Sequence, residues 1–246
     1  MRSRNIYDPI KYATGNKPFR VSRSKIDNFL KCPRCFYLDR RLGVGQPDGP
    51  AFTINILVDA LLKREFDGYR EKEKIHPIME EHGIQGIPAQ HEMLGEWRNN
   101  FKGVSYYDQP KNLEFFGAID DLWLLHNGEY CVVDYKATAT TKEISLDKGW
   151  GIFYKRQAEI YQWLLRNNGL NVSDTAYFLY CNGDYSQESF DRKIEFKVEM
   201  HEHIGSDDWI EDVTLNLWEC LQEDTPPPPG EECNYCSYRS DSIAQL

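Results

Sequence analysis

Two residues whose types can do chemistry, Asp134 and Lys136, stand at the end of the apolar segment GEYCVVDYK, which predicts a buried strand. Side chains alternate between the two faces of a strand, so Asp134 and Lys136 point the same way and Tyr135 points to the opposite face. The segment LEFFGAIDDLWLL, which we expect to be the preceding strand, carries two more carboxylates, Asp120 and Asp121. The pattern predicts a pair of carboxylates and a lysine on one face of a β-hairpin.

The turn between these two segments, HNG, decides which aspartate lies opposite Asp134. A two-residue Asn-Gly loop places Asp121 there. A three-residue loop, with Gly128 in a left-handed bulge, places Asp120 there instead. The turn sequence by itself leaves both registers open.

A divalent cation would explain two carboxylates in close contact, because it relieves a repulsion that otherwise shifts the pKa of each. Mg²⁺ binds carboxylate oxygens and keeps several waters. Held at this hairpin, Mg²⁺ or Mn²⁺ would polarise a phosphoryl oxygen and activate a water, with Lys136 steadying the developing charge. These residue types indicate phosphodiester hydrolysis.

Three motifs follow one another in the sequence: GAID, then VVDYK, then QAEIY. Together they resemble the RecB-like branch of the PD-(D/E)XK nucleases, whose motifs read G-x-I-D, an apolar run ending in D-x-K, and Q-x-x-x-Y on a helix. The resemblance implies that Asp120 and Asp134 bind the metal and that Lys136 is the catalytic lysine, which favours the three-residue loop. It also implies that Gln157 and Tyr161, at i and i+4 on one helix face, line the groove near the metal.

The family usually carries one more metal ligand, a histidine, on the helix before this hairpin. In the segment NILVDALLK the matching position is Asp59. A carboxylate also suits a hard divalent cation. The resemblance therefore makes Asp59 a candidate third ligand beside Asp120 and Asp134.

Four of the seven cysteines form two C-x2-C pairs near the two ends of the sequence, Cys32 with Cys35 and Cys233 with Cys236. This pairing predicts one four-thiolate site that joins the terminal segments and has a structural role. The isolated cysteines stand inside apolar segments and are expected to be core residues: Cys131, Cys181 and Cys220.

The segments CPRCFYL and CNYCSYR also resemble RecB-like nucleases of the CRISPR-associated and AddB types, which hold a four-iron cluster with one early and three late cysteines. Here Ser242 stands at the family's last cysteine position, and Cys35 is the natural replacement. The resemblance implies a [4Fe–4S] cluster, whereas paired C-x2-C segments also suit a tetrahedral Zn²⁺. We favour the cluster on the resemblance and keep zinc as the alternative.

The elements that must position these groups follow from apolar spacing. Helical spacing predicts helices over residues 22–32, 53–66, 151–168 and 207–222. Apolar runs or alternation predict strands over residues 113–125, 129–136, 175–181 and 190–200. Residues 1–20 lack periodicity and are expected to be an extended arm.

This order of elements predicts an α/β fold. With the resemblance, we expect a restriction-endonuclease-like core with a central mixed β-sheet flanked by helices, and N- and C-terminal segments joined at the four-cysteine site. We expect one domain over residues 1–246, with residues 1–50 and 201–246 forming its helical, cysteine-bearing part.

The 246-residue chain carries a net charge of −10, from 29 Lys and Arg against 39 Asp and Glu. This charge argues against a protein that coats phosphates, but a local basic groove on an acidic body is compatible with a nucleic-acid enzyme. No apolar run approaches the roughly 18 residues of a membrane helix. The segment MRSRNIYDPIKY lacks the apolar core of a secretory signal. We expect a cytoplasmic protein with no membrane partner.

These patterns predict a divalent-metal-dependent deoxyribonuclease. Following the resemblance, we expect exonuclease action on single-stranded DNA ends, in DNA repair, recombination or CRISPR-type processing, with protein partners in such a complex. Two alternatives stay open. One is a catalytically silent DNA-binding module of the same fold. The other is a scaffold protein that a structural zinc ion holds together and whose acidic surface binds a protein.

Overall fold

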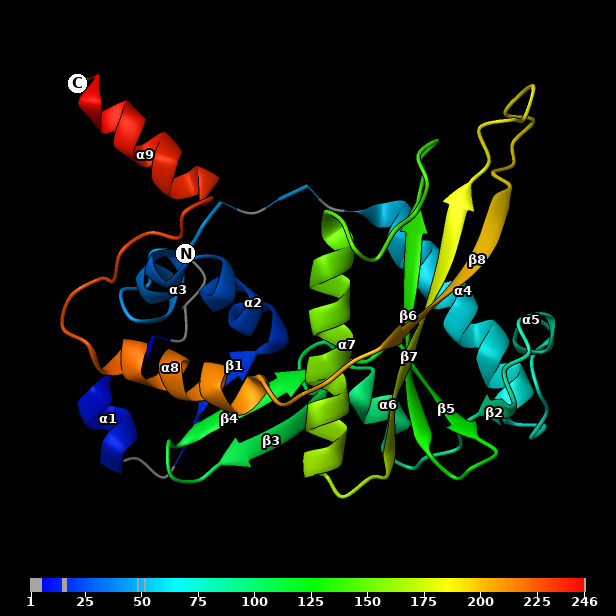
Figure 1. Ribbon diagram of the computed structural model, residues 1–246, viewed down its shortest axis with the longest axis horizontal. Coiled ribbons are helices and arrows are strands. Elements are labelled where there is room, and N and C mark those ends of the chain that lie inside the picture. Colours follow the sequence, from blue (N-terminus) through cyan, green and yellow to red (C-terminus); the bar gives the residue numbers. More distant parts are fainter. Residues whose placement is uncertain (1–5, 15–16, 48, 51, 246) are drawn as a thin grey trace. The chain divides into compact units, whose positions relative to one another are not determined.

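Figure 1 shows the computed structural model of the chain, in which residues 6–14, 17–47, 49–50 and 52–245 are described. The described residues form two compact units. The first draws on Met1–Gly49, Ser105–Phe116 and Asp208–Leu246, and the second on Pro50–Val104 and Gly117–Asp207. The single domain expected over residues 1–246, with 1–50 and 201–246 as its cysteine-bearing part, stays a prediction.

The second unit is built on a five-stranded sheet with the order β2-β5-β6-β7-β8. Its strands are β2 (Gly86–Pro88), β5 (Asp121–Leu125), β6 (Tyr130–Thr138), β7 (Val172–Gly183) and β8 (Phe196–Ile204). β6 and β7 pair in parallel, and the other neighbours pair antiparallel, so the sheet is mixed. The strands predicted over residues 129–136 and 175–181 therefore lie side by side within this sheet.

Two long helices cover opposite faces of this sheet (Figure 1). The helices of the unit are α4 (Thr53–Arg70), α5 (Pro77–Glu81), α6 (Leu94–Trp97) and α7 (Trp150–Asn167). α4 packs Leu62 and Phe66 onto the face of β6 that carries Tyr135. α7 directs Gln157 to Asp134, which lies on the other face. The acid and the lysine of β6 therefore face α7.

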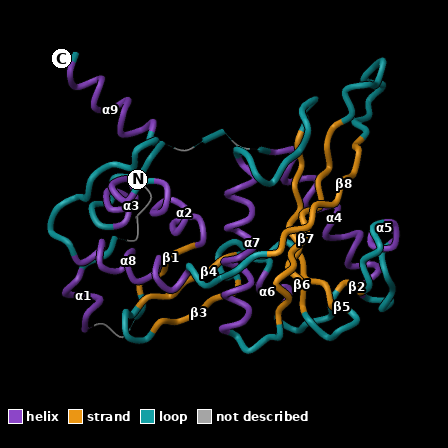
Figure 2. The backbone as a smooth tube through the Cα atoms, in the orientation of Figure 1, coloured by secondary structure: helices purple, strands orange, loops and turns teal. Residues whose placement is uncertain are grey.

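The first unit carries a three-stranded sheet with the order β1-β4-β3. Its elements are β1 (Phe19–Ser22), β3 (Val104–Asp108), β4 (Leu113–Gly117), α1 (Pro9–Thr14), α2 (Arg23–Lys31), α3 (Pro33–Arg40), α8 (Ile210–Gln222) and α9 (Asn234–Ala244). Figure 2 shows the helices α3 and α9 of this unit. The first residues of these helices follow Cys32 and Cys233, which belong to the group of four neighbouring cysteines. The predicted fold class is confirmed: a mixed sheet flanked by helices, with terminal segments joined at four cysteines.

The single strand expected over residues 113–125 is wrong. It consists of two strands, β4 and β5, which belong to different sheets. Between them the backbone N–H of Ile119 donates to the carbonyl of Trp97 at 3.2 Å, so the chain leaves the strand ladder there. Ile119 is fully buried. Because Ile119 is as apolar and as buried as the strand residues, the sequence pattern does not reveal the break.

The extended arm expected over residues 1–20 also needs correction. Its described part contains the short helix α1 and the strand β1, which pairs in parallel with β4. Tyr7, Tyr12 and Phe19 pack together there, with ring centroids between 5.1 and 5.3 Å apart. Aromatic packing orders this segment without the periodicity that a longer helix would show.

The strand expected over residues 190–200 begins later and runs farther. β8 starts at Phe196 because the preceding residues close a loop, in which the N–H of Asp184 donates to the carbonyl of Glu195 at 2.8 Å. Ile194, expected on the apolar face of the strand, lies outside it and is exposed.

Among the described residues, no helix combines the length and the apolar character needed to cross a bilayer.

Candidate active site and four-cysteine site

The hairpin of β5 and β6 has the register that places Asp120 level with Asp134. The N–H of Leu125 donates to the carbonyl of Glu129 at 2.9 Å, so the loop holds three residues. Gly128 ends this loop with φ of +81°, a left-handed conformation that glycine adopts without strain. Asp121 then pairs with Val133, and Asp120 is the next residue toward Asp134. The predicted three-residue loop is confirmed.

Asp120 is held at both of its carboxylate oxygens. Oδ2 accepts the backbone N–H of Tyr135 at 3.0 Å, and Oδ1 accepts from Nζ of Lys63 at 3.0 Å. Its side chain is 23% exposed. A carboxylate oxygen can accept two bonds, so Asp120 is fixed in orientation and still has lone pairs for a ligand.

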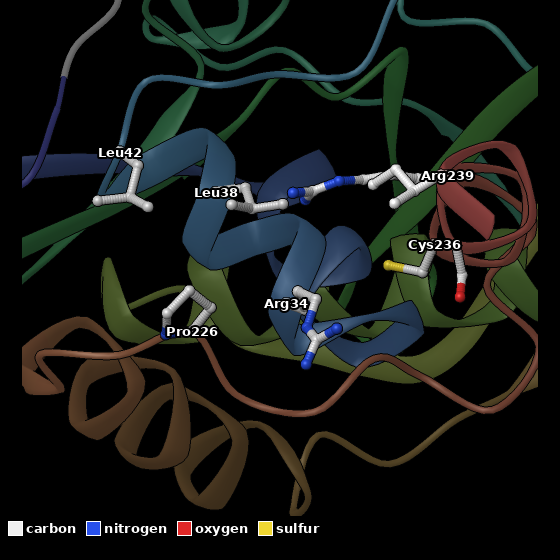
Figure 3. Close-up of a pocket in the computed structure, with 8 residues that line it drawn as sticks. Arg34, Leu38, Leu42, Pro226, Cys236 and Arg239 are labelled. Atoms are coloured by element: carbon white, nitrogen blue, oxygen red, sulfur yellow. The ribbon is translucent and has the colours of Figure 1, made fainter. Parts of the chain in front are cut away.

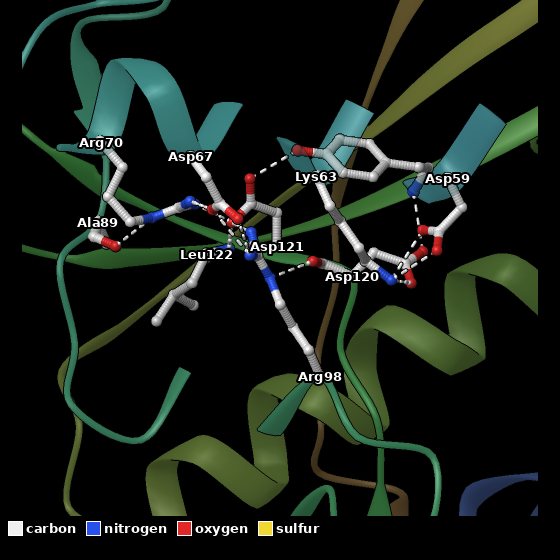
Figure 4. A network of polar contacts seen from close by, with 10 residues as sticks. Asp59, Lys63, Asp67, Arg70, Ala89, Arg98, Asp120, Asp121 and Leu122 are labelled. Atoms are coloured by element: carbon white, nitrogen blue, oxygen red, sulfur yellow. Dashed lines mark hydrogen bonds and ion pairs between the residues drawn. The ribbon is translucent and has the colours of Figure 1, made fainter. Parts of the chain in front are cut away.

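Asp121, the neighbouring acid, has a different environment. Its side chain is fully buried and forms ion pairs with Arg70 and Arg98 (Figure 4). It also accepts from the hydroxyl of Tyr135 at 2.6 Å and from the backbone N–H of Leu122 at 2.7 Å. Asp121 thus makes its ion pairs and hydrogen bonds inside the protein, the environment of a structural acid.

Asp134, Lys136, Gln157 and Tyr161 form one connected group between β6 and α7. The amide Nε2 of Gln157 donates to Oδ1 of Asp134 at 2.7 Å and to the hydroxyl of Tyr161 at 3.1 Å. Lys136 forms an ion pair with Asp134 and lies 3.4 Å from Oε1 of Gln157. The structure therefore brings together these four residues that the sequence motifs singled out.

The side chain of Lys136 is only 15% exposed, and its surroundings favour the protonated, positively charged form. Burial alone would lower the pKa of its ammonium group, but the carboxylates of Asp134 and Asp120 outweigh burial and raise that pKa. Its Nζ also lies 4.2 Å from the ring centre of Tyr154, a favourable position for a cation. The lysine is thus a fixed positive charge beside two acids.

Asp59, the candidate third ligand, lies on α4 and faces the same region. Burial raises the pKa of its carboxyl group, and the negative charge of Asp120 raises it further. Asp59 and Asp120 are therefore close enough to repel each other. The ammonium group of Lys63 lies between the two acids and offsets part of this repulsion, and a divalent cation at the same place would offset it with twice the charge.

Lys63 is the residue of this site that the sequence reasoning missed. It follows Asp59 by one helical turn and forms ion pairs with both Asp59 and Asp120. The signal was present, since residues at i and i+4 share a helix face. No family motif includes position 63, so only the helical spacing from Asp59 indicated this lysine.

A small cavity of about 230 Å³ opens beside these groups. It is lined by Phe52, Asn55, Val58, Asp59, Tyr135, Lys136, Ala137 and Tyr154. Asp59 of α4 and Lys136 of β6 thus face one space. Asp59 is the one carboxylate among these lining residues, and Asp120 and Asp134 lie outside the lining. Carboxylate oxygens are the ligands that Mg²⁺ and Mn²⁺ prefer, so the three acids suit such an ion by their chemistry.

The four paired cysteines lie together in the first unit. Their sulfur atoms are all within 4.8 Å of one another, and of the four only Cys236 is partly exposed. Figure 3 shows Cys236 at the edge of a cavity of about 570 Å³, between Arg34 of α3 and Arg239 of α9. The predicted four-thiolate cluster of side chains, joining segments from the two ends of the sequence, is confirmed.

Gly230 lets the segment before α9 approach the first cysteine pair. A Cβ atom at this position would lie 2.3 Å from the carbonyl oxygen of Lys31, so any other residue would push the segment away. In this position the backbone N–H of Gly230 donates to Sγ of Cys32 at 3.3 Å. Burial alone would raise the pKa of Cys32, but the N–H groups of Gly230 and Cys35 and the neighbouring thiols bring it down to about 7.

The isolated cysteines lie elsewhere. Cys131 and Cys181 are buried in the second unit, and Cys220 is partly buried on α8. Burial raises the pKa of the thiol in Cys181 and in Cys220 to about 11. Their location agrees with the predicted packing role.

Comparison with known proteins defines the class. The sequence matches the PD-(D/E)XK nuclease superfamily over residues 58–240, a stretch that includes the whole hairpin and α7. The chain belongs to the PD-(D/E)XK nuclease superfamily. No curated protein matches it. The crystal structure of SSO0001 is similar, with 16% sequence identity and a TM-score of 0.46 over 95% of this chain and 90% of that chain.

Asp121→Asn tests the structural role of the buried acid, because it removes the charge that pairs with Arg70 and Arg98 while keeping the size of the side chain. We expect the free energy of unfolding to fall by about 3–5 kcal/mol, since a buried pair broken on one side leaves uncompensated charge. Urea denaturation measures this loss. The matched control, Asp120→Asn, should cost less than about 1 kcal/mol, because its ion pair is partly exposed. Equal losses would contradict the assignment.

Cys32→Ser and Cys233→Ser test whether the two cysteine pairs share one site. Each variant should lose the bound metal, melt at a lower temperature and expose the TPPPPG segment to protease. The double variant should be little worse than either single variant, because one lost ligand already opens the site. The control variant Cys131→Ser should keep the metal that is bound at the four paired cysteines. Additive effects of the two substitutions on melting temperature would show two separate sites.

Proposed function

We propose that this protein is a divalent-metal-dependent deoxyribonuclease. The observation that supports the proposal is the convergence of Asp120, Asp134 and Lys136, with Gln157 bonded to Asp134. Membership of the PD-(D/E)XK nuclease superfamily supports nuclease activity independently of this geometry. In this proposal Asp120 and Asp134 hold Mg²⁺ or Mn²⁺, and Asp59 contributes from α4.

The metal ion would polarise the scissile phosphate and lower the pKa of the attacking water. Side chains of the protein would stabilise the developing charge and fix the carboxylates. Lys136, kept charged by Asp134 and Asp120, stabilises the negative charge that develops on the phosphate. Gln157 fixes one oxygen of Asp134, and Tyr161 fixes Gln157. These bonds hold the carboxylate in one orientation before the substrate arrives, which lowers the reorganisation needed in the reaction.

The substrate is proposed to be single-stranded DNA, attacked from its ends. The RecB-like motifs support this choice, and so does the cavity beside Lys136, which is lined by the aromatic rings of Phe52 and Tyr154. Phe52 is 68% exposed. Exposed rings stack on the unpaired bases of single strands. The proposed setting is DNA repair, recombination or CRISPR-type processing, in the cytoplasm and with protein partners.

Cleavage of end-labelled single- and double-stranded DNA, with Mg²⁺ or Mn²⁺ and with a chelator, tests the proposal. Asp120→Asn, Asp134→Asn and Lys136→Ala should each lower the rate by roughly 10²-fold or more, as expected when a group that stabilises the transition state is lost. Asp147→Asn is the matched control, because Asp147 is exposed and pairs only with Lys155 among the ion pairs described.

Metal-dependent cleavage that survives in all three variants would refute the assignment of these residues. Absence of cleavage by the unaltered protein on every DNA substrate, with either metal, would instead support the catalytically silent binding module.

A further inference from the structure

The distances between the four cysteine sulfurs distinguish a single metal ion from an iron–sulfur cluster. Sγ of Cys35 lies 3.5 Å from Sγ of Cys233 and 3.7 Å from Sγ of Cys236. Sγ of Cys32 lies 3.7 Å from Sγ of Cys236. The four sulfurs therefore form a compact group with short edges.

A single tetrahedral ion requires this spacing. With zinc–sulfur bonds of about 2.3 Å, tetrahedral geometry places neighbouring sulfurs about 3.8 Å apart. In a [4Fe–4S] cluster each thiolate binds a different iron atom, so the sulfurs stand farther apart by the width of the cluster. The measured distances match the spacing around one tetrahedral ion, and they are too short for the cluster that the family resemblance implies.

We infer that Cys32, Cys35, Cys233 and Cys236 bind one structural zinc ion and no iron–sulfur cluster. All four ligands are thiolates of the chain, so the coordination shell is closed and leaves no position for a substrate. The ion joins the N-terminal end of α3 to that of α9.

Metal analysis of protein made in medium containing both iron and zinc, and purified without oxygen, tests this inference. We expect one zinc ion per chain that is released by a thiol-modifying reagent, and no absorbance of an iron–sulfur cluster. Cys236→Ser should lose this zinc, whereas Cys220→Ser should keep it. Stoichiometric iron and sulfide, or an intact protein with no zinc at the cysteines, would overturn the inference.

Cobalt substitution gives a second measurement on the unaltered protein, in case a cysteine variant fails to fold. Co²⁺ held by four thiolates in a tetrahedron gives intense visible bands, and zinc should displace it. Octahedral cobalt, with only weak absorbance, would contradict a closed thiolate site.

A different observation, the position of Lys63, carries a second inference, which rests on the proposed metal at Asp120. Nζ of Lys63 lies 2.8 Å from each carboxylate oxygen of Asp59 and 3.0 Å from Oδ1 of Asp120 (Figure 4). The ammonium group therefore bridges the two acids that were expected to bind the metal.

Lys63 and a divalent ion need the same oxygens. Oδ2 of Asp120 accepts the backbone N–H of Tyr135, so Oδ1 is the oxygen that faces Asp59. An ion held jointly by Asp59 and Asp120 must take the place of the ammonium group. The carboxylates of Asp59, Asp120 and Asp134 carry three negative charges. Two positive charges come from two ammonium groups, those of Lys63 and Lys136. The net charge of the group is therefore −1, and removal of Lys63 would make it −2.

We propose that Lys63 is a displaceable counter-ion. It holds Asp59 and Asp120 together while the metal is absent, and it swings out when the ion binds. Lys63 thereby competes with the metal and sets the concentration at which the site fills.

Mn²⁺ titration of the whole protein, followed by electron paramagnetic resonance, tests the competition. Lys63→Met should bind Mn²⁺ on the order of tenfold more tightly, the effect expected when one charge-assisted pair no longer has to be broken. Lys63→Arg keeps the charge and should bind as the unaltered protein does. In an Asp59→Asn background the gain from Lys63→Met should shrink, because both the ammonium group and the ion have lost a partner.

Chemical acetylation, read by peptide mass spectrometry, reports on Lys63 directly. Its reactivity should rise when Mn²⁺ is added, while that of the exposed Lys74 should not change. Equal or weaker Mn²⁺ binding by Lys63→Met, or better protection of Lys63 with Mn²⁺, would refute the competition and leave the proposed nuclease intact. An unaltered protein that binds no Mn²⁺ at the carboxylates would refute the proposed function itself.

Discussion

The burial of a charged carboxylate, that of Asp121, is the constraint on which the rest of the candidate active site depends. A carboxylate with no exposed surface is stable only if it is paired and fully hydrogen-bonded. Here the partners come from three places: Arg70 from the end of α4, Arg98 from the end of α6, and Tyr135 from the neighbouring strand. One acid therefore fixes the positions of two helices relative to the hairpin.

The consequence for the candidate active site concerns Asp120, one residue earlier in the chain. Arg98 donates to the backbone carbonyl of Asp120 at 2.9 Å as well as pairing with Asp121. A slip of the hairpin by one residue would place Asp121 level with Asp134 and leave the two guanidinium groups buried without their acid. The turn at Gly128 and the buried ion pairs thus enforce the same register from opposite ends of β5. Two adjacent aspartates can then have separate roles, one structural and one available to a ligand.

The sequence predicted the parts of this site that are local or carried by a motif. Residue alternation placed Asp134 and Lys136 on one face, and the family motifs resolved the two registers that the turn left open. The break at Ile119 could not be predicted, because its cause is a bond to the carbonyl of Trp97, which no local pattern records. The partners of Asp121 were hidden for the same reason, since Arg70 and Arg98 are distant in sequence. Lys63 could have been predicted, because it follows Asp59 by four residues and so shares its helix face, but it belongs to no family motif.

The two sites differ in how far along the chain their parts are spread. The candidate active site uses residues from Asp59 to Tyr161, all in the second unit. The cysteine site joins Cys32 to Cys236, so its closure constrains a loop of nearly the whole chain, and the cost of closing a loop grows only slowly with its length. The free energy of binding a metal at a closed site can offset the entropy lost in closing this loop. The cysteines thus join segments from the two ends of the sequence within the first unit, while the orientation of Asp120 and Asp134 comes from hydrogen bonds made within the second.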